Sequence, residues 1–505
     1  MKTSRTHIFC ILALSLFCLT SAGQAPGQQQ SRKETISSAI RTVAGDPALA
    51  QGVVSICIRT ADGVTVAEHR SGTLSVPASN MKLLSTGVAL HVLGGDYRYE
   101  TEIGYSGRIE DGILKGDLYI IGGGDPTLGS KDSIAVSIDR TFGQWERLLT
   151  DAGIRKIEGR IIGDGRWAEG MAEEPTWSWQ DVGVYYGTGV TGLMFYENML
   201  SFTATAGSGL GAPVSIEQSY PLTPWMSIRN EATTGKQGTG DETYMYTSEF
   251  APVAAIRGTF AIDRKTKRVD FSNKFPEYTC ARYFEDRLRK RGIGCSLGAA
   301  DFRLKTDWLS DGSDSTEITI LGKTQSPALR RIAFSTNHVS NNLYAETLMK
   351  TIGLEIAGST AYEASATAMT QALEKMGVST TKGVHIQDGS GLSRQNYVSA
   401  DFLCRFLKAM MSSPAYKDFL NSLPSPGFNG SLQFNMKSYP EDLRKRIKVK
   451  SGSMNGVRCY SGYILPSTEG GETLIISILT SNSTAPAWKT RQLLDKLMAT
   501  IAQTN

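Results

Sequence analysis

SVPASNMKLLST, residues 75–86, places a serine and a lysine three positions apart, at Ser79 and Lys82. The apolar run that follows to Leu93 is too apolar for a surface helix, so we expect a buried helix that begins near Ser79. Residues three apart share one face of a helix, which puts the lysine amine beside the serine hydroxyl. A desolvated lysine can take the proton of a serine, and the N–H groups at a helix N-terminus can stabilise an oxyanion. The segment therefore predicts a serine nucleophile with a lysine base.

This spacing is a weak signal when it stands alone. A second Ser-x-x-Lys, Ser379 to Lys382, lies in a polar stretch before Gly383 with no apolar helix after it, so we expect a loop there. The interpretation of Ser79 therefore depends on partners further along the chain.

The length of 505 residues is enough for two or three domains, and a formal charge of +4 gives no argument for a nucleic acid or a membrane surface. Residues 1–22 resemble a secretory signal peptide, with Lys2 and Arg5 before an apolar core and a small-residue cleavage site at 20–22. We expect no transmembrane helix after it, and therefore secretion across the inner membrane to a periplasmic or extracytoplasmic location.

Five cysteines remain in the mature chain, and their odd number and scattered positions do not indicate a disulfide framework. Cys280 and Cys295 could pair or could remain buried thiols. No cluster of cysteine and histidine has metal-ligand spacing, so we expect neither a metal nor another cofactor.

The order of strand-like and helical segments predicts an α+β fold. After a flexible segment at 24–32 and a hairpin at 52–69, residues 96–310 are mostly strand-like and show no evident chemistry. Four aromatic residues at 177–186 could bind sugar or peptide, or could pack in a core or a domain interface. Helices are expected within 327–376, strands at 447–450, 460–465 and 473–480, and a final helix at 485–501.

Ser340-Asn341-Asn342 precedes one of the expected helices, and this position favours it over the other Ser-x-Asn segments at 335–337 and 453–455. On a turn, Ser340 can place its hydroxyl near Lys82, and Asn342 can place its amide near a substrate carbonyl.

Lys450-Ser451-Gly452-Ser453 contains the one Lys-Ser/Thr-Gly of the chain and ends a predicted strand. Gly452 lets a ligand approach the strand closely, Lys450 supplies positive charge, and the hydroxyls of Ser451 and Ser453 can hold a carboxylate. The alternative is an edge strand with a solvated lysine.

The three segments occur in the order found in penicillin-recognising serine enzymes. The chain resembles the class C low-molecular-weight penicillin-binding proteins, the D-alanyl-D-alanine carboxypeptidase/endopeptidase family of S13-type serine peptidases. Further stretches that resemble the family are 116–119, 123–128, 388–394, 430–432 and 450–463. The sequence departs from the family at Lys450–Ser453, where Lys-Thr-Gly-Thr is usual, but the hydroxyls are retained.

The resemblance implies a β-lactamase/transpeptidase-like catalytic domain, an antiparallel sheet flanked by helices, built from residues 30–95 and 311–505. The mostly β insertion at 96–310 then forms one or two non-catalytic domains. The implied substrates are peptidoglycan stem peptides that end in D-Ala-D-Ala, or cross-links between stems, with β-lactams as covalent inhibitors. The resemblance assigns catalysis to Ser79, Lys82 and Ser340, and substrate binding to the following residues: Asn342, Lys450, Ser451, Gly452 and Ser453.

Two alternatives remain at this point. A β-lactamase or esterase can use the same scaffold, but class A β-lactamases use a Glu-x-x-x-Asn segment, and none lies between Asn342 and Lys450. A non-catalytic peptidoglycan-binding or β-lactam-sensing protein is the other alternative, although such sensors usually carry membrane spans. The balance of carboxypeptidase and endopeptidase activity, the diamino acid of the stem and the oligomeric state stay open.

Overall fold

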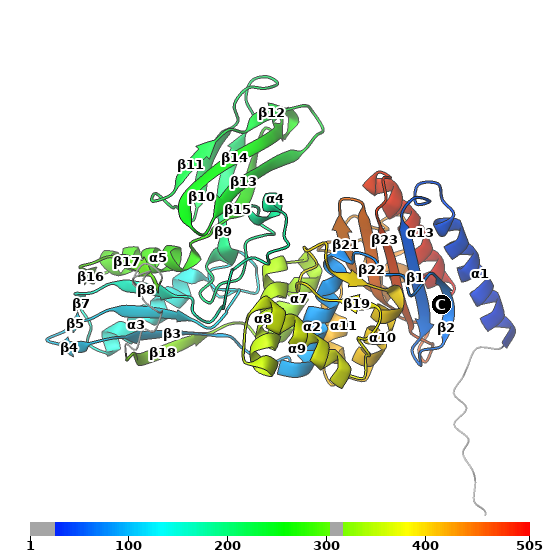
Figure 1. Ribbon diagram of the computed structural model, residues 1–505, viewed down its shortest axis with the longest axis horizontal. Helices are drawn as coiled ribbons and strands as arrows, with labels where there is room; N and C mark the ends of the chain where they lie inside the picture. The colour runs from blue at the N-terminus through cyan, green and yellow to red at the C-terminus, as the bar shows by residue number, and fades with distance from the viewer. Residues whose placement is uncertain (1–25, 303–316) are drawn as a thin grey trace, which may run out of the picture.

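The computed structural model describes residues 26–302 and 317–505. The expected signal peptide, residues 1–22, lies outside this part of the chain. Figure 1 shows a sheet formed by both ends of the chain, a block of helices beside it, and two further groups of strands formed by the middle of the chain.

Both ends of the chain contribute to one five-stranded antiparallel sheet, with strand order β2-β1-β23-β22-β21. β1 pairs with β23 in continuous register, from Val53 opposite Ser481 to Thr60 opposite Leu474. β23 is buried at every position, so both faces of the sheet need a cover of helices. The strands are β1 (Val53–Thr60), β2 (Thr65–His69), β21 (Ile447–Met454), β22 (Val457–Ile464) and β23 (Leu474–Ser481).

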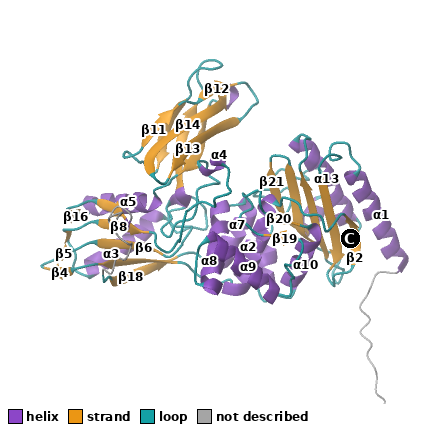
Figure 2. Cartoon of the chain, viewed as in Figure 1, coloured by secondary structure: helices purple, strands orange, loops and turns teal. Residues whose placement is uncertain are grey.

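Helices cover both faces of this sheet, which confirms the α+β prediction (Figure 2). On one face, α1 (Pro26–Ala44) and α13 (Ala487–Gln503) enclose a core that includes Ile478. The other face packs on α2 (Met81–Leu93), the predicted buried helix. The remaining helices on that side are α7 (Leu329–Val339), α8 (Asn342–Ala357), α9 (Tyr362–Lys375), α10 (Ala400–Met411) and α11 (Tyr416–Ser422).

The flexible segment expected at 24–32 is wrong, because α1 already begins at Pro26. Ile36 and Ile40 lie on the buried face of this helix. One turn earlier Arg32 is also nearly buried and forms an ion pair of 2.7 Å with Glu472. This ion pair extends the packed face of the helix. Because the two residues are far apart in the sequence, no local sequence pattern predicts their contact.

The middle of the chain forms two further groups of sheets. The first contains a sheet of order β17-β8-β6-β3-β18 and a sheet of order β16-β7-β5-β4, packed with α3 and α5 around Trp145 and Phe284. The second contains a sheet of order β10-β9-β15 and a sheet of β11 to β14, around Phe260 and Phe271. Each group has its own apolar core. The expected division of the insertion into one or two domains stays a prediction.

The bounds of these elements are β3 (Glu100–Tyr105), β4 (Arg108–Glu110), β5 (Ile113–Lys115), β6 (Leu118–Gly122), α3 (Ile138–Asp151), β7 (Lys156–Ile157), β8 (Ile161–Asp164), α4 (Trp179–Val182), β9 (Met199–Thr205), β10 (Ser215–Tyr220), β11 (Ser227–Asn230), β12 (Thr233–Gly235), β13 (Asp241–Ser248), β14 (Ala251–Ala261), β15 (Thr266–Ser272), α5 (Pro276–Lys290), β16 (Gly294–Cys295), β17 (Ala299–Asp301) and β18 (Thr319–Gln325).

The chain leaves the helical block along β3 and returns along β18, and these strands pair with each other. At their base the Ser326 N–H donates to the Tyr99 carbonyl oxygen at 2.9 Å. The expected border near residue 310 stays a prediction, and the pairing of β18 argues for a border after Gln325. The described residues contain no helix that is both long and apolar enough for a membrane span, and all five of their cysteines, including Cys280 and Cys295, are free.

Candidate active site

Ser79 lies in a 3-10 turn, Ala78–Asn80, immediately before α2. The turn is tightly packed, since a Cβ atom on Gly391 would lie 1.9 Å from the Ala78 carbonyl oxygen. Lys82, in the first turn of α2, is fully buried, and its Nζ lies 2.9 Å from Ser79 Oγ. The structure thus places the lysine amine beside the serine hydroxyl, as the spacing predicts.

Lys82 Nζ contacts three oxygen atoms that come from three separate segments. It donates to Ser79 Oγ (2.9 Å), to Asn342 Oδ1 (2.6 Å) and to the Ser390 carbonyl oxygen (2.8 Å). An amine with three acceptors in three directions is fixed in one position, so its distance to Ser79 is set by the surrounding chain.

Burial lowers the pKa of Lys82 to about 7, while the carboxylates of Glu346 and Asp388 act in the opposite direction. We expect the charge of Lys450 to contribute to this shift, but the repulsion between the two amines instead adds to burial in lowering the pKa of Lys450. The carboxylates favour charge on Lys82, whereas burial and the nearby Lys82 both disfavour charge on Lys450. Near neutral pH a large fraction of Lys82 is therefore uncharged and able to accept a proton.

The carbonyl that Lys82 contacts belongs to a loop that buried carboxylates hold in place. Glu346 accepts hydrogen bonds from the N–H groups of Gly389 (2.9 Å) and Ser390 (2.7 Å), and burial raises its pKa to about 8. Asp388 accepts two more N–H groups further along the same loop, and burial raises its pKa as well. These contacts explain why residues 388–394, quoted for the family resemblance, form a compact loop against the serine turn.

Ser340 and Asn342 lie at the junction of α7 and α8, where we expect a turn. Ser340 ends α7 in the left-handed conformation, with φ of 60° and ψ of 40°. We expect its hydroxyl near Lys82, but it instead accepts a hydrogen bond of 2.9 Å from Lys450 Nζ. Asn342 occupies the position beside Lys82. The hydroxyl and the amide therefore face different lysines.

Lys450, Ser451, Gly452 and Ser453 lie on β21, the edge strand of the five-stranded sheet. We expect Gly452 to permit the close approach of a ligand, but a Cβ atom there would lie 2.5 Å from the Pro77 carbonyl oxygen. The glycine is therefore required by the approach of the strand to the serine turn.

The side chains of β21 differ in exposure. Lys450 is fully buried, while Ser453 is exposed. Ser451 is half-buried, and its hydroxyl donates to Ser431 Oγ at 3.3 Å. The expected alternative of a solvated Lys450 on an edge strand is thus wrong, because its amine is buried and donates to Ser340 Oγ and to the Ser451 carbonyl oxygen.

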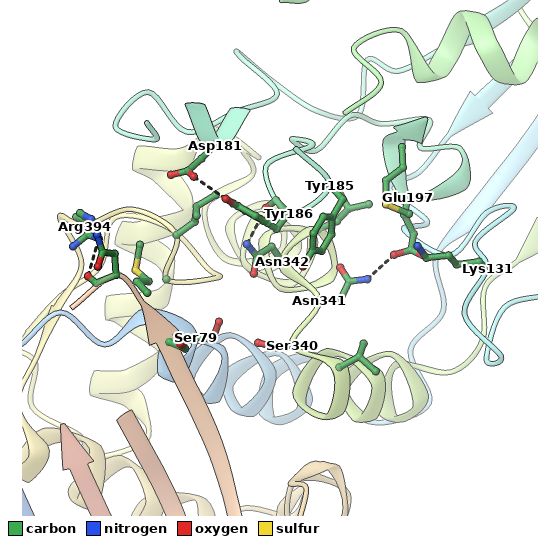
Figure 3. A pocket seen from close by; sticks show the side chains of 18 residues that line it. Ser79, Lys131, Asp181, Tyr185, Tyr186, Glu197, Ser340, Asn341, Asn342 and Arg394 are labelled. Carbon is green, nitrogen blue, oxygen red and sulfur yellow. Dashed lines mark hydrogen bonds between the residues drawn. The ribbon is translucent and has the colours of Figure 1, made fainter. Parts of the chain in front are cut away.

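A cavity of about 660 Å³ opens over these segments (Figure 3). Ser79, Ser340, Asn342 and Ser453 line it, whereas Lys82 and Lys450 do not line it but donate to the lining residues Ser79 and Ser340. The other lining residues are Lys131, Asp181, Tyr185, Tyr186, Glu197, Met199, Val339, Asn341, Leu343, Gly391, Leu392, Arg394, Met454 and Asn455.

Six of the lining residues belong to the insertion, from which we expect no chemistry. The aromatic residues at 177–186 were the one sequence feature that could have indicated a contribution from the insertion. In the structure they lie at different places. Tyr185 and Tyr186 line the cavity, Trp177 donates to the Asp388 carboxylate at 2.9 Å, and Trp179 is exposed. Lys131 and Glu197 had no recognisable pattern around them. Within the described residues, no group of three or more histidine, cysteine, aspartate or glutamate side chains is placed to hold a metal ion.

The comparisons with known proteins agree with this geometry. Residues 36–501 match the model of the D-Ala-D-Ala carboxypeptidase 3 (S13) family. A D-alanyl-D-alanine carboxypeptidase of Actinomadura sp. (strain R39) is 26% identical over 498 residues, which cover 94% of this chain and 87% of that protein. The D-alanyl-D-alanine carboxypeptidase DacB of Haemophilus influenzae is 21% identical and covers 83% of each chain.

The fold has a close counterpart among solved structures. Penicillin binding protein 4 (dacB) from Haemophilus influenzae superposes with a TM-score of 0.76 at 18% identity, covering 91% of this chain and 97% of that one. This similarity confirms the predicted penicillin-binding fold with its large insertion.

Proposed function

Since this chain belongs to the D-Ala-D-Ala carboxypeptidase 3 (S13) family and is a serine-type D-Ala-D-Ala carboxypeptidase, we propose that it acts on peptidoglycan stem peptides through an acyl-enzyme at Ser79. The observation that carries this proposal is the 2.9 Å contact between Lys82 Nζ and the Oγ of Ser79, which lines the cavity.

In the acylation step, Ser79 Oγ attacks the carbonyl carbon of the penultimate D-Ala and passes its proton to the uncharged Lys82 amine. The oxyanion that forms accepts hydrogen bonds from the backbone N–H groups of Ser79 and Ser453. The bond to the terminal D-Ala then breaks, and its nitrogen receives a proton through Ser340. Water hydrolyses the resulting ester and restores the serine.

The substrate is held by groups from β21 and α8. Ser451 and Ser453 bind the terminal carboxylate, whose approach favours the charged form of Lys450 because an opposite charge stabilises an ammonium group. Asn342 uses one hydrogen of its amide nitrogen for the Tyr186 carbonyl oxygen, and the second hydrogen can bind the acyl-side carbonyl of the peptide.

A β-lactam acylates the same serine and inhibits the enzyme, and a cross-link between two stems is an alternative peptide substrate. The basic and apolar N-terminal sequence directs the protein across the inner membrane, where these substrates occur. We further propose that both chain ends form the catalytic domain and that the insertion forms two domains; the separate sheets of the insertion support this division, and six of its residues line the cavity.

Labelled penicillin tests the proposal directly. After incubation and digestion, we expect the label on the peptide that contains Ser79, and no label in Ser79→Ala. The mutant should release D-Ala from a stem peptide at least about 10³-fold more slowly than the wild type. Label on a different serine would refute the assignment. Turnover of the β-lactam that is fast compared with D-Ala release would instead favour a β-lactamase.

A further inference from the structure

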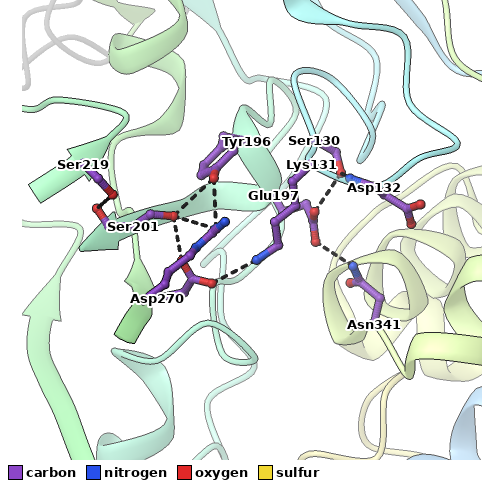
Figure 4. A network of polar contacts seen from close by, with 10 residues as sticks. Ser130, Lys131, Asp132, Tyr196, Glu197, Ser201, Ser219, Asp270 and Asn341 are labelled. Carbon is purple, nitrogen blue, oxygen red and sulfur yellow. Dashed lines mark hydrogen bonds and ion pairs between the residues drawn. The ribbon is translucent and has the colours of Figure 1, made fainter. Parts of the chain in front are cut away.

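The insertion contacts both asparagines that follow Ser340, and Figure 4 shows the contact between Asn341 and Glu197. Asn341 Nδ2 donates to Glu197 Oε2 at 2.8 Å, and Asn342 Nδ2 donates to the Tyr186 carbonyl oxygen at 2.8 Å. Glu197 and Tyr186 both belong to the insertion, whereas the asparagines begin α8. Residues 340–342, which contact both lysines of the site, are thus held by hydrogen bonds from the insertion.

Glu197 projects from a turn with an uncommon backbone. Tyr196, Glu197 and Asn198 have φ of 55°, 56° and 51°, in the left-handed region that residues other than glycine rarely adopt. Such a conformation persists only where the surroundings enforce it, and it often lies at functional sites.

Both neighbours of Glu197 are fixed by side-chain contacts. Asn198 is fully buried, and its side chain contacts the Gly189 carbonyl oxygen (3.1 Å) and the Phe195 N–H (3.1 Å). The Tyr196 hydroxyl accepts a hydrogen bond of 2.9 Å from Arg268. The turn therefore presents the Glu197 carboxylate in one direction.

The carboxylate itself is engaged at both oxygens and only 8% exposed. Oε1 accepts the Ser130 hydroxyl at 2.7 Å, and Oε2 accepts the Asn341 amide. Hydrogen bonds to an ionised acceptor are stronger than those between neutral groups, so a carboxylate holds Asn341 more firmly than water would.

Asn341 connects this contact to the reacting groups. Its Oδ1 accepts the Tyr344 N–H at 3.1 Å and so caps α8. On one side of it Ser340 has the left-handed backbone that directs its hydroxyl to Lys450, and on the other Asn342 contacts Lys82. A rotation of Asn341 would move both neighbours relative to the two amines.

We propose that Glu197 is a positioning residue for acylation, which acts by holding Asn341 so that Ser340 and Asn342 meet Lys450 and Lys82. This inference rests on the proposed function of Ser79. Displacement of catalytic groups by about 1 Å can cost on the order of 10²-fold in rate, so removal of the contact between Glu197 and Asn341 should slow acylation by about that factor.

The test compares acylation by labelled penicillin in four variants of the full-length chain. Glu197→Ala removes the acceptor, and Asn341→Asp sets two carboxylates against each other, so both should lower the acylation rate constant. Glu197→Gln keeps an acceptor oxygen and should retain most of the rate. In the double variant Glu197→Gln/Asn341→Asp the glutamine amide donates to the new carboxylate, which restores the link and should recover the rate lost in Asn341→Asp.

Glu285→Ala is the matched control, because Glu285 is also a glutamate of the insertion that is 8% exposed, and it contacts Arg282 on α5. It should acylate at the wild-type rate, and thermal unfolding of each variant shows whether it is folded. Wild-type rates in Glu197→Ala, or a double variant no faster than Asn341→Asp, would overturn the proposal. Absence of label in the wild type would instead contradict the function of Ser79 itself.

Discussion

Lys82 determines, at the scale of single residues, the pH at which acylation can occur. Its pKa is lowered from 10.5 to about 7, so the amine is uncharged above that pH and protonated below it. Because only the uncharged amine accepts a proton, the second-order rate of acylation by penicillin should rise with pH, with a midpoint near 7, and fall about tenfold per pH unit well below it. Rates measured between pH 5 and 9 check this expectation.

Lys382 provides the control for that profile. It belongs to the second Ser-x-x-Lys, which lies in a segment without helix or strand, as predicted. Lys382→Met should leave the profile unchanged. A wild-type rate that is flat through pH 7 and rises only toward pH 10 would show that Lys82 is charged during the reaction and is not the base.

The residues of the site differ in how far they could be predicted. Ser79 and Lys82 lie within one helical turn, so their spacing in the sequence determines the distance between them. Ser340 precedes a predicted helix and Lys450 ends a predicted strand, so both could be found from the sequence. The contact between Lys450 and Ser340 joins residues 110 positions apart, and nothing local indicates which lysine the hydroxyl faces. Glu197 stands in no motif, and Tyr186 acts through its backbone carbonyl, which any residue could supply.

At the scale of elements, the approach of β21 to the serine turn depends on Gly452. In Gly452→Ala the new Cβ would lie 2.5 Å from the Pro77 carbonyl oxygen, so the strand has to move away. We expect a loss of about 1–3 kcal/mol in the free energy of unfolding and a loss on the order of 10²-fold in acylation rate. Denaturant unfolding and penicillin labelling measure the two effects.

Gly72→Ala is the companion variant, since Gly72 lies in an exposed turn of the same domain and a Cβ there meets nothing within 4 Å. It should change neither quantity. Full acylation in Gly452→Ala would mean that the strand can approach Ser79 without the glycine.

The elements themselves were predictable where local pattern decides them. The apolar run after Lys82 gave α2, and short strand-like segments gave β1 and β23. The first turns of α1 were missed because their packing depends on Arg32 and Glu472, which meet only in the folded chain. The pairing of β18 with β3 was missed because these strands also meet only in the folded chain. This pairing is the reason to place the end of the insertion after Gln325.

At the scale of the whole molecule, an apolar contact joins the insertion to the helices that carry the site. Met194 and Val190 of the insertion pack with Tyr99, Ile332 and Tyr344, and Met194 is 1% exposed. Glu197 follows Met194 by three residues, so this small core also positions the Glu197 carboxylate that holds Asn341. Loosening the core should therefore affect both stability and acylation.

We expect Met194→Ala to lower the free energy of unfolding by about 2–5 kcal/mol, because a buried side chain is replaced by a cavity. The acylation rate should fall as well, measured at a temperature where the variant is folded. Ile256→Ala creates a comparable cavity in the core around Phe260 and Phe271, which contains none of residues 194–198. It should lose similar stability but keep the wild-type rate. A wild-type acylation rate in both variants would mean that the packing between the insertion and the helices does not control the chemistry. The insertion would then contribute to the site only through the residues that line the cavity.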